Sequence, residues 1–231
     1  AFLDAFHEYG IDPTMEEVRG PMGMLKIDHI RTMLQGERIS ALWRDKYGRD
    51  WTEKDVQDVY ELSEKKILEI LPDFADPKPY VTETVASLRE MGMKIGSTTG
   101  YTDEMMSIVV PKAKELGYEP DCWFSPNAVE NYGRPYPYMI FKNMETLGLS
   151  DVRAVIKVGD TVSDIREGIH AGMKTVGIVE GSSVLGLSKG EFDALTEKEQ
   201  REQYERAEKI YKEAGADYVI RDIRGLLDIV K

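Results

Sequence analysis

Apolar residues recur at helical spacing from the start of the chain to about Leu71. The helices that this pattern predicts lie at 1–6, 12–20, about 23–34, 39–47 and 52–71. Asp12 with Pro13 behind it is a typical helix start, and Thr52 with Asp55 three residues later is a capping pair for the longest helix. The first part of the chain is therefore predicted to be a compact helical unit.

Beyond about Val81, short apolar strands alternate with helices, which is typical of a parallel sheet covered on both faces. The predicted strands lie at about 94–98, 122–124, 154–158, 175–179 and 217–220. Glycines expected to end helices in the left-handed conformation lie at 92, 117, 148 and 172. We predict a charged amphipathic helix at 196–215 and an exposed loop, with room for a short helix, at 181–195. The prolines between 72 and 80 mark the linker between the two parts.

Composition limits the classes of partner. The 231 residues carry a formal net charge of −12 at pH 7, which argues against nucleic acid or an anionic membrane as the main partner. A phosphate-bearing substrate would then need a local cationic pocket or a metal. Cys122 is the single cysteine, which excludes an internal disulfide and suits a reducing cytoplasm. No apolar run approaches the length that a bilayer span requires.

The stretch around Asp160 carries the first candidate chemistry. Apolar residues at 155, 156 and 158 predict a buried strand, so Asp160 lies where a parallel strand passes into a loop. Ligands of open α/β sheets bind at that edge. A carboxylate there can hold Mg²⁺, which prefers hard oxygen ligands near a phosphate. The alternative is that Asp160 and Asp164 only cap the helix that begins near Ser163.

Two further loops hold polar groups suited to phosphate. Ser97, Thr98 and Thr99 end a strand just before Gly100, and a hydroxyl with the N–H groups of such a turn can bind phosphate oxygens. Such residues also commonly cap the next helix. Arg134 lies in a rigid Gly-Arg-Pro-Tyr-Pro loop. Arginine suits bidentate phosphate contact, although a loop arginine can also be simply solvated.

These three motifs, in this order and spacing, resemble motifs II, III and IV of the haloacid dehalogenase superfamily. The match is closest to its phosphonatase family, through the segments Arg19–His29, Gly96–Thr102, Gly133–Pro137 and Ile156–Asp164. The resemblance covers essentially the whole chain. It implies an α/β fold, with a Rossmann-like parallel-sheet core of the haloacid dehalogenase type at 76–231. It also implies an inserted all-helical cap domain at 1–75, which begins with the connecting helix.

The resemblance implies an activity as well: Mg²⁺-dependent hydrolysis of the carbon–phosphorus bond of phosphonoacetaldehyde to acetaldehyde and phosphate, in 2-aminoethylphosphonate degradation. The catalytic residues implied are Lys26, His29, Thr99 and Arg134; the substrate-binding residues are Met22, Gly100 and Tyr101; Asp160 binds the metal and Asp164 supports its surroundings.

Lys26 would form a Schiff base with the aldehyde. Partial burial and the positive end of a helix both favour its free amine. His29, three residues later on the same helical face, would move protons through a water. Each residue also has an ordinary interpretation. Lys26 can lie over an apolar patch, His29 can be a core histidine, and Met22 can fill a core or an interface.

The family's motif for the attacking aspartate, Asp-x-Ala-Gly-Thr, is absent from this sequence. We expect it upstream of Ala1, on a central strand of the sheet, together with the remaining metal ligands. The family also implies a homodimer through the cap, which the methionine-rich apolar early helices favour. Two alternatives stay open: a capped phosphatase or phosphomutase acting on a small phosphate ester, and a non-catalytic binding protein of the same fold.

Overall fold

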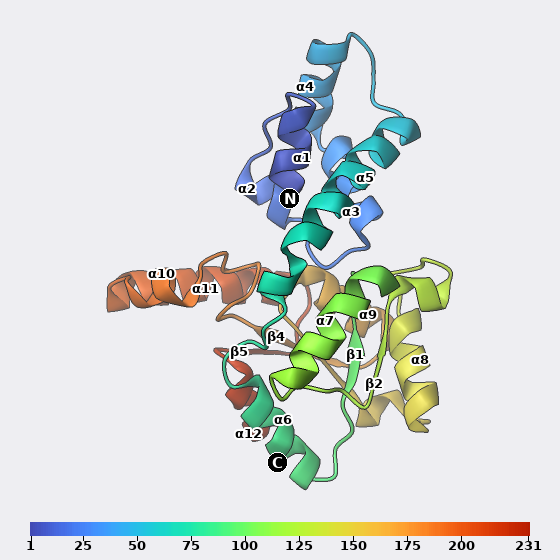
Figure 1. The fold of residues 1–231 in the computed structure, drawn as a ribbon. Helices are drawn as coiled ribbons and strands as arrows, with labels where there is room; N and C mark the ends of the chain where they lie inside the picture. The colour runs from blue at the N-terminus through green and yellow to red at the C-terminus, as the bar shows by residue number, and fades with distance from the viewer.

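The computed structural model describes residues 1–231 as a helical unit set on an α/β unit (Figure 1). We call residues 1–75 the cap and residues 76–231 the core, and this division remains the one predicted from the sequence. The cap contains α1 (Phe2–Glu8), α2 (Met15–Arg19), α3 (Lys26–Gln35), α4 (Glu37–Tyr47), α5 (Glu53–Ile70) and the 3-10 helix η1 (Leu71–Phe74). None of the chain's helices combines the length and the apolar character needed to cross a membrane.

The ends of the cap helices follow local capping chemistry. Thr52 begins α5 as predicted, because its N–H donates to the Asp55 carboxylate at 2.8 Å in a reciprocal capping box. The predicted start of α2 at Asp12 is wrong, since Thr14 forms the capping box with Glu17. The predicted start of α3 at residue 23 is also wrong. Gly23 has a φ of 86°, outside the range of a right-handed helix, and the helix begins at Lys26.

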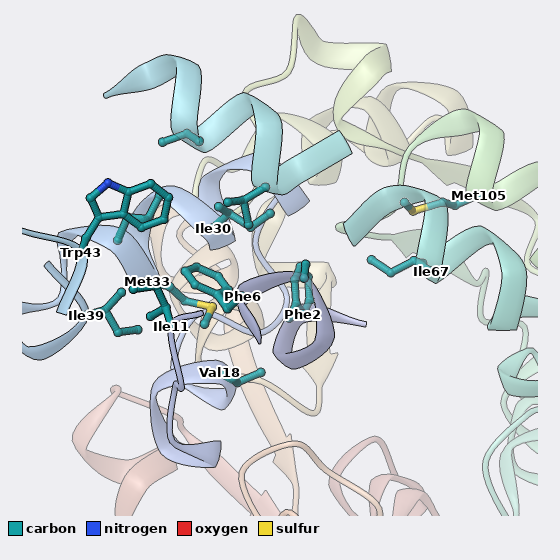
Figure 2. Close-up of a cluster of buried hydrophobic side chains, with 14 of the residues drawn as sticks. Phe2, Phe6, Ile11, Val18, Ile30, Met33, Ile39, Trp43, Ile67 and Met105 are labelled. Carbon is teal, nitrogen blue, oxygen red and sulfur yellow. The ribbon is translucent and has the colours of Figure 1, made fainter. Parts of the chain in front are cut away.

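One hydrophobic cluster holds the cap together (Figure 2). Phe6, Ile30 and Trp43 are fully buried in it and come from three different helices. Burial of each such side chain contributes roughly 1.5–3 kcal/mol. Met105, from helix α7 (Asp103–Glu115) of the core, belongs to the same cluster and lies near Ile67 of α5 in Figure 2. The cap and the core therefore share part of their apolar interior.

The core contains five strands that pair only in parallel: β1 (Gly96–Thr98), β2 (Cys122–Phe124), β3 (Ile156–Gly159), β4 (Lys174–Ile178) and β5 (Tyr218–Ile220). All five lie within two residues of their predicted bounds. They form two sheets, β1–β2 and β3–β4–β5, instead of one continuous sheet. A cavity of about 960 Å³ is walled by residues of both β1 and β3. Each of these two strands has one edge without a strand partner.

Helices join the strands and cover them. They are α6 (Val81–Glu90), α7, α8 (Tyr138–Leu147), α9 (Val162–Ala171), α10 (Lys189–Asp193), α11 (Glu197–Glu213) and α12 (Leu226–Ile229). Short 3-10 helices lie at η2 (Pro126–Val129), η3 (Val152–Ala154) and η4 (Ile223–Gly225). Gly148 and Gly172 end α8 and α9 with φ values of 68° and 78°, as predicted. In Figure 1, α10 and α11 extend to one side of the core.

The segment 181–195 is not the exposed loop that the sequence predicts. Leu185 and Phe192 are buried in a cluster with Ala207 and Tyr211 of α11. Phe192 lies in α10, which is the short helix for which the prediction left room. The two apolar side chains are seven positions apart and lack a regular period around them, which explains why the sequence pattern did not reveal their burial.

Candidate active site

The candidate site lies where the turn between α2 and α3 meets the end of β1. Gly100, just after β1, packs directly against this turn. A Cβ atom at Gly100 would lie 2.5 Å from the Met24 carbonyl oxygen and 2.8 Å from that of Gly23. Glycine is therefore required for the backbones to approach so closely. The contact fixes the residue that follows the turn, Lys26, over the core.

Lys26 is a buried amine without a carboxylate partner. It is the first residue of α3, and only 7% of its surface is exposed. Its Nζ lies 4.8 Å from the ring centroid of Tyr101 and 5.7 Å from that of Phe2. Burial, followed by the positive charge of Arg134, lowers the pKa of Lys26 to about 8. At pH 7, roughly a tenth of the amine is therefore unprotonated and nucleophilic.

His29 lies one turn further along α3 and is completely buried. Its ring stacks on Phe2 with 4.1 Å between the centroids, and neither ring nitrogen has a hydrogen-bond partner. Burial, followed by the charge of Lys26, lowers the pKa of His29 to about 3. The imidazole is thus neutral at physiological pH and keeps one donor and one acceptor nitrogen.

The turn after β1 places Thr99 and Tyr101 in the same region. The Thr99 Oγ1 accepts a hydrogen bond from the Tyr101 N–H at 3.0 Å. Thr102 caps α7, so Thr99 is not occupied as a helix cap. Burial, followed by the negative charge of Asp160, raises the pKa of Tyr101. The Tyr101 ring therefore lies against the amine of Lys26 from the cap, and its hydroxyl is under the influence of the Asp160 charge from the core.

Arg134 is buried at the base of the site. Its Nη2 donates to the backbone oxygen of Thr98 at 2.6 Å and to the Thr98 hydroxyl at 2.9 Å. Its Nε contacts Glu167 at 3.1 Å, and its Nη1 contacts Asp164 at 3.1 Å. The weakest contact runs from Nη1 to the Gly23 carbonyl in the cap, at 3.5 Å. Burial alone would lower the pKa of Arg134, but the charges of Asp164 and Glu167 raise it.

The two aspartates of the third motif differ in their surroundings. Asp164 is tightly bound: its Oδ1 pairs with Lys157 at 2.9 Å, and its Oδ2 accepts from the Thr161 hydroxyl at 2.6 Å. Its carboxylate takes part in the capping box that Thr161 begins at the start of α9, and it also pairs with Arg134 and Lys157, so capping is not its only contact. Asp160 forms no ion pair. Burial, followed by the charge of Asp164, raises the pKa of Asp160, although the charges of Arg134 and Lys78 act in the opposite direction.

The structure thus brings the predicted residues of three core loops and of the cap to one region. Lys26 and His29 come from α3, Thr99 to Tyr101 from the turn after β1, and Arg134 from the loop before α8. Asp160 follows β3. Met22 is half-buried in the turn before α3, and its role in substrate binding remains a prediction.

Comparison with known proteins identifies the family. The model of the haloacid dehalogenase-like hydrolases matches residues 3–172, and a second, HAD-hydrolase-like model matches residues 131–226. The phosphonoacetaldehyde hydrolase of Lysinibacillus sphaericus is 49% identical over 97% of this chain and 84% of that protein. This chain is a phosphonatase-family member of the haloacid dehalogenase-like hydrolases. A relative in Clostridioides difficile, 48% identical, is a bifunctional phosphonoacetaldehyde hydrolase/aminoethylphosphonate transaminase, of which the match covers 36%.

Solved structures agree with this assignment. A phosphonoacetaldehyde hydrolase-like protein from Oleispira antarctica superposes with a TM-score of 0.94 at 35% identity, over 99% of this chain and 83% of that one. A hydrolase from Pseudomonas syringae superposes with a TM-score of 0.68 at 18% identity, over 99% and 88% of the two chains, and it supports the fold alone. The predicted α/β fold of the haloacid dehalogenase type is confirmed.

Sequence reasoning missed two charged residues of this hydrolase in the surroundings of Arg134, namely Lys157 and Glu167. They contact each other at 2.8 Å, and both contact the Thr98 hydroxyl, Lys157 at 2.7 Å and Glu167 at 2.9 Å. Lys157 did carry a signal, because it is the one charged residue in an otherwise apolar strand. Glu167 also carried one, since it lies three residues after Asp164 and hence on the same face of α9.

Proposed function

We propose that this hydrolase cleaves the carbon–phosphorus bond of phosphonoacetaldehyde to acetaldehyde and phosphate, in the degradation of 2-aminoethylphosphonate. The observation that carries the proposal is Lys26, a buried amine with a pKa of about 8 and no carboxylate partner. Hydrolysis of a simple phosphate ester does not require a free amine, whereas an aldehyde can react with one. The names of the relatives in L. sphaericus and Bacillus cereus support this substrate.

The amine would make the carbon a viable leaving group. Lys26 attacks the aldehyde carbon, and loss of one water gives an imine. The protonated imine withdraws electrons, so the carbon–phosphorus bond breaks with its electron pair passing into an enamine while a nucleophile attacks phosphorus. Protonation of the enamine carbon and addition of water to the imine then release acetaldehyde and regenerate Lys26. His29 would pass protons through a water during these steps.

Core residues would hold the phosphonate group. Thr99 can donate its hydroxyl hydrogen to one oxygen, because its oxygen already accepts from Tyr101. Arg134 can exchange its 3.5 Å contact with the Gly23 carbonyl for a phosphonate oxygen and keep its other partners. Gly100 keeps the turn of the cap close to this position, and Tyr101 and Met22 would border the aldehyde.

Asp160 suits one position of a magnesium site. Its carboxylate forms no ion pair and lies close to a second carboxylate, so a cation there would relieve an unfavourable interaction. Asp160 would contribute one carboxylate to the ion, and the family resemblance implies that further ligands lie upstream of Ala1. Magnesium, when bound, would neutralise charge on the phosphoryl oxygens. Asp164 would keep Arg134 and the loop after β3 that carries Asp160 in place.

We propose that the attacking aspartate, which would form an aspartyl phosphate, lies on a further strand upstream of Ala1. The cavity of about 960 Å³ between β1 and β3 supports this position. Ile95, Ile156 and Val158 contribute apolar surface to its wall. A strand seated there would pair with the free edges of β1 and β3 and would end near Thr99 and Asp160.

Reduction with borohydride in the presence of phosphonoacetaldehyde tests the proposal. An imine at Lys26 is reduced to a stable amine, so mass spectrometry should find the two-carbon adduct on the peptide that contains Lys26. Lys157, which is equally buried but paired with two carboxylates, is the internal control and should remain unmodified. An unmodified Lys26, or phosphate release that persists in Lys26→Arg with a phosphate ester, would instead favour a capped phosphatase.

We further propose a cytoplasmic homodimer that associates through the cap. Met15 and Tyr47 of the cap are exposed apolar side chains that such a contact would cover. The single cysteine is compatible with a reducing compartment. Light scattering at several protein concentrations measures the mass, and Met15→Glu with Tyr47→Glu should shift it from that of a dimer to that of a monomer. A monomer at all concentrations of the unaltered protein contradicts the proposal.

A further inference from the structure

Four charged side chains beneath the phosphonate position form a closed ring of ion pairs. The cations are Arg134 and Lys157, and the anions are Asp164 and Glu167. Each cation contacts both anions, at distances of 2.8 to 3.1 Å. All four residues are buried, so the charges are compensated almost entirely by one another.

Glu167 is the least exposed member of this ring, with no solvent-accessible surface. Its Oε2 accepts from the Arg134 Nε at 3.1 Å, from the Lys157 Nζ at 2.8 Å and from the Thr98 hydroxyl at 2.9 Å. Its Oε1 has no hydrogen-bond partner. One oxygen therefore joins three side chains that come from three separate segments of the core.

Close packing of α9 makes this arrangement rigid. A Cβ atom at Gly168 would lie 2.8 Å from the Cβ of Lys157 and 2.5 Å from the Cγ2 of Thr175. Glycine thus lets α9 lie directly against β3 and β4, and the neighbouring Glu167 projects from this face of the helix. A shorter or displaced side chain at 167 would not reach all three partners.

The ring determines which edge of the guanidinium of Arg134 is available to substrate. Glu167 occupies Nε, and Thr98 occupies Nη2 through two acceptors. The Nη1 atom has Asp164 and the distant Gly23 carbonyl as partners. Because the guanidinium is planar, fixing Nε and Nη2 also fixes the direction of Nη1.

We propose that Glu167 is a positioning residue of the phosphonate site, which acts by holding Arg134, with Lys157 and Thr98, in the orientation that presents Nη1 to a phosphonyl or phosphate oxygen. The proposal rests on the proposed function for the identity of the substrate. The positioning itself concerns any phosphate-like anion at Arg134.

Binding of inorganic phosphate to the full protein, measured by calorimetry with magnesium present, tests the positioning without turnover. We compare the unaltered protein, Glu167→Gln, Arg134→Lys and the double variant, with Glu205→Gln on the exposed face of α11 as the matched control. Glu167→Gln should weaken phosphate binding by about tenfold and lower kcat by about 10–100-fold, since small misplacements at a reacting centre have effects of this size. The control should match the unaltered protein.

The double variant separates positioning from a general structural role. If Glu167 acts through Arg134, adding Glu167→Gln to Arg134→Lys should change phosphate affinity by no more than about twofold, whereas independent effects would multiply. Multiplying effects, or a phosphate affinity that Glu167→Gln leaves unchanged, would overturn the proposal. Glu167→Asp should regain part of the lost affinity if the carboxylate is what matters.

Two further results keep the outcome clear. If Glu167→Gln does not fold, Lys157→Met combined with Glu167→Leu removes one charge of each sign, and the same comparison with Arg134→Lys is made in that background. If the unaltered protein binds phosphate through Arg134 but does not turn over phosphonoacetaldehyde, the proposed function fails while the phosphate coupling still decides the role of Glu167.

Discussion

Two buried lysines lie in the same active-site region and have opposite surroundings. Lys26 in the cap is 7% exposed and Lys157 in the core is 9% exposed. Lys26 has aromatic rings beside it and no carboxylate, and its pKa is lowered to about 8. Lys157 donates to the Thr98 hydroxyl and pairs with both Asp164 and Glu167.

The comparison teaches that burial alone does not make a lysine nucleophilic. A buried ammonium with anionic partners is held by ion pairs and orients its neighbours, whereas burial without such partners favours loss of the proton. The structure contains both arrangements: an amine without a carboxylate partner in the cap, and a closed ring of ion pairs in the core. The two lysines therefore predict opposite responses to the same substitution.

Replacing each lysine by methionine should give the largest and most clearly divided effects. Lys26→Met removes the proposed imine former and should lower kcat by at least about 10³-fold, the scale on which an enzyme loses a covalent nucleophile. It should also raise the free energy of unfolding by about 1–3 kcal/mol at pH 7, because an unpaired buried amine is removed. Steady-state kinetics and urea unfolding measure the two effects.

Lys157→Met is the matched variant and should act in the other direction on stability. It leaves Asp164 and Glu167 with only Arg134 for compensation, so the free energy of unfolding should fall by about 3–5 kcal/mol. Borohydride should still label Lys26 in the fraction that folds. If both substitutions change stability with the same sign, the contrast between the two lysines is wrong.

Gly100→Ala should separate the cap site from the core without altering either set of charges. The added Cβ would lie 2.5 Å from the Met24 carbonyl oxygen, so the turn that carries Lys26 must move away. A displacement of about 1 Å can lower activity by about 100-fold, and we expect an effect of that order on kcat/KM. Inorganic phosphate, which needs only the core, should bind with nearly unchanged affinity.

Gly190→Ala is the control for this prediction. Gly190 is in α10, and nothing lies within 4 Å of the position of an added Cβ. Its activity should equal that of the unaltered protein. A Gly100→Ala variant with full activity would mean that the contact between Gly100 and the turn does not position Lys26.

The features that could be predicted from the sequence are those that depend on residues close together in the chain. The five strands and the capping pair of Thr52 and Asp55 follow from periodicity and from side chains that bond to the adjacent backbone. The candidate residues at Lys26 and Asp160 were found because they stand out in short motifs. Their meeting in one region required the resemblance to a family, since periodicity says nothing of which loops converge.

The charge ring shows what could not be predicted. Glu167 is 33 positions from Arg134 and 69 from Thr98, and its role depends on α9 lying flat on β3. Apart from its spacing from Asp164, nothing in the sequence distinguishes Glu167 from the many solvated glutamates of the chain. The burial of Leu185 and Phe192 was missed as well, because it results from packing against Ala207 and Tyr211 of α11, which no periodic pattern in the segment itself reveals.

The pH dependence of activity gives a further test of the contrast between the two lysines. Below about pH 8, kcat/KM should change by about tenfold for each pH unit. In the proposed mechanism only the unprotonated amine of Lys26 can attack the aldehyde, so kcat/KM should rise with pH through about 8 and then level off. Stability gives an independent check. Between about pH 8 and the ordinary lysine value of 10.5, the unfolded chain binds more protons than the folded one, so the free energy of unfolding should rise with pH.

Lys26→Met is the control for both pH measurements. Its unfolding free energy should lack the part of the rise that the unaltered protein shows above pH 8. If the unaltered protein and Lys26→Met have parallel stability profiles, Lys26 does not have a lowered pKa in the folded state.

The smallest expected effect concerns a contact between the cap and the loop after β4. The Arg19 Nη2 donates to the Gly186 carbonyl at 2.7 Å, and Ser183 in the same loop donates its hydroxyl to the backbone oxygen of Asp160 at 3.2 Å. Arg19→Gln should loosen the cap by about the value of one hydrogen bond, 0.5–1.5 kcal/mol, and so raise KM by about two- to tenfold with kcat nearly unchanged. Arg153→Gln, which affects only a surface ion pair with Asp151, should leave both constants as they are. A fall in kcat at constant KM would contradict this prediction. It would mean that Arg19 affects the chemical step and that its hydrogen bond to Gly186 does not act by holding the cap on the core.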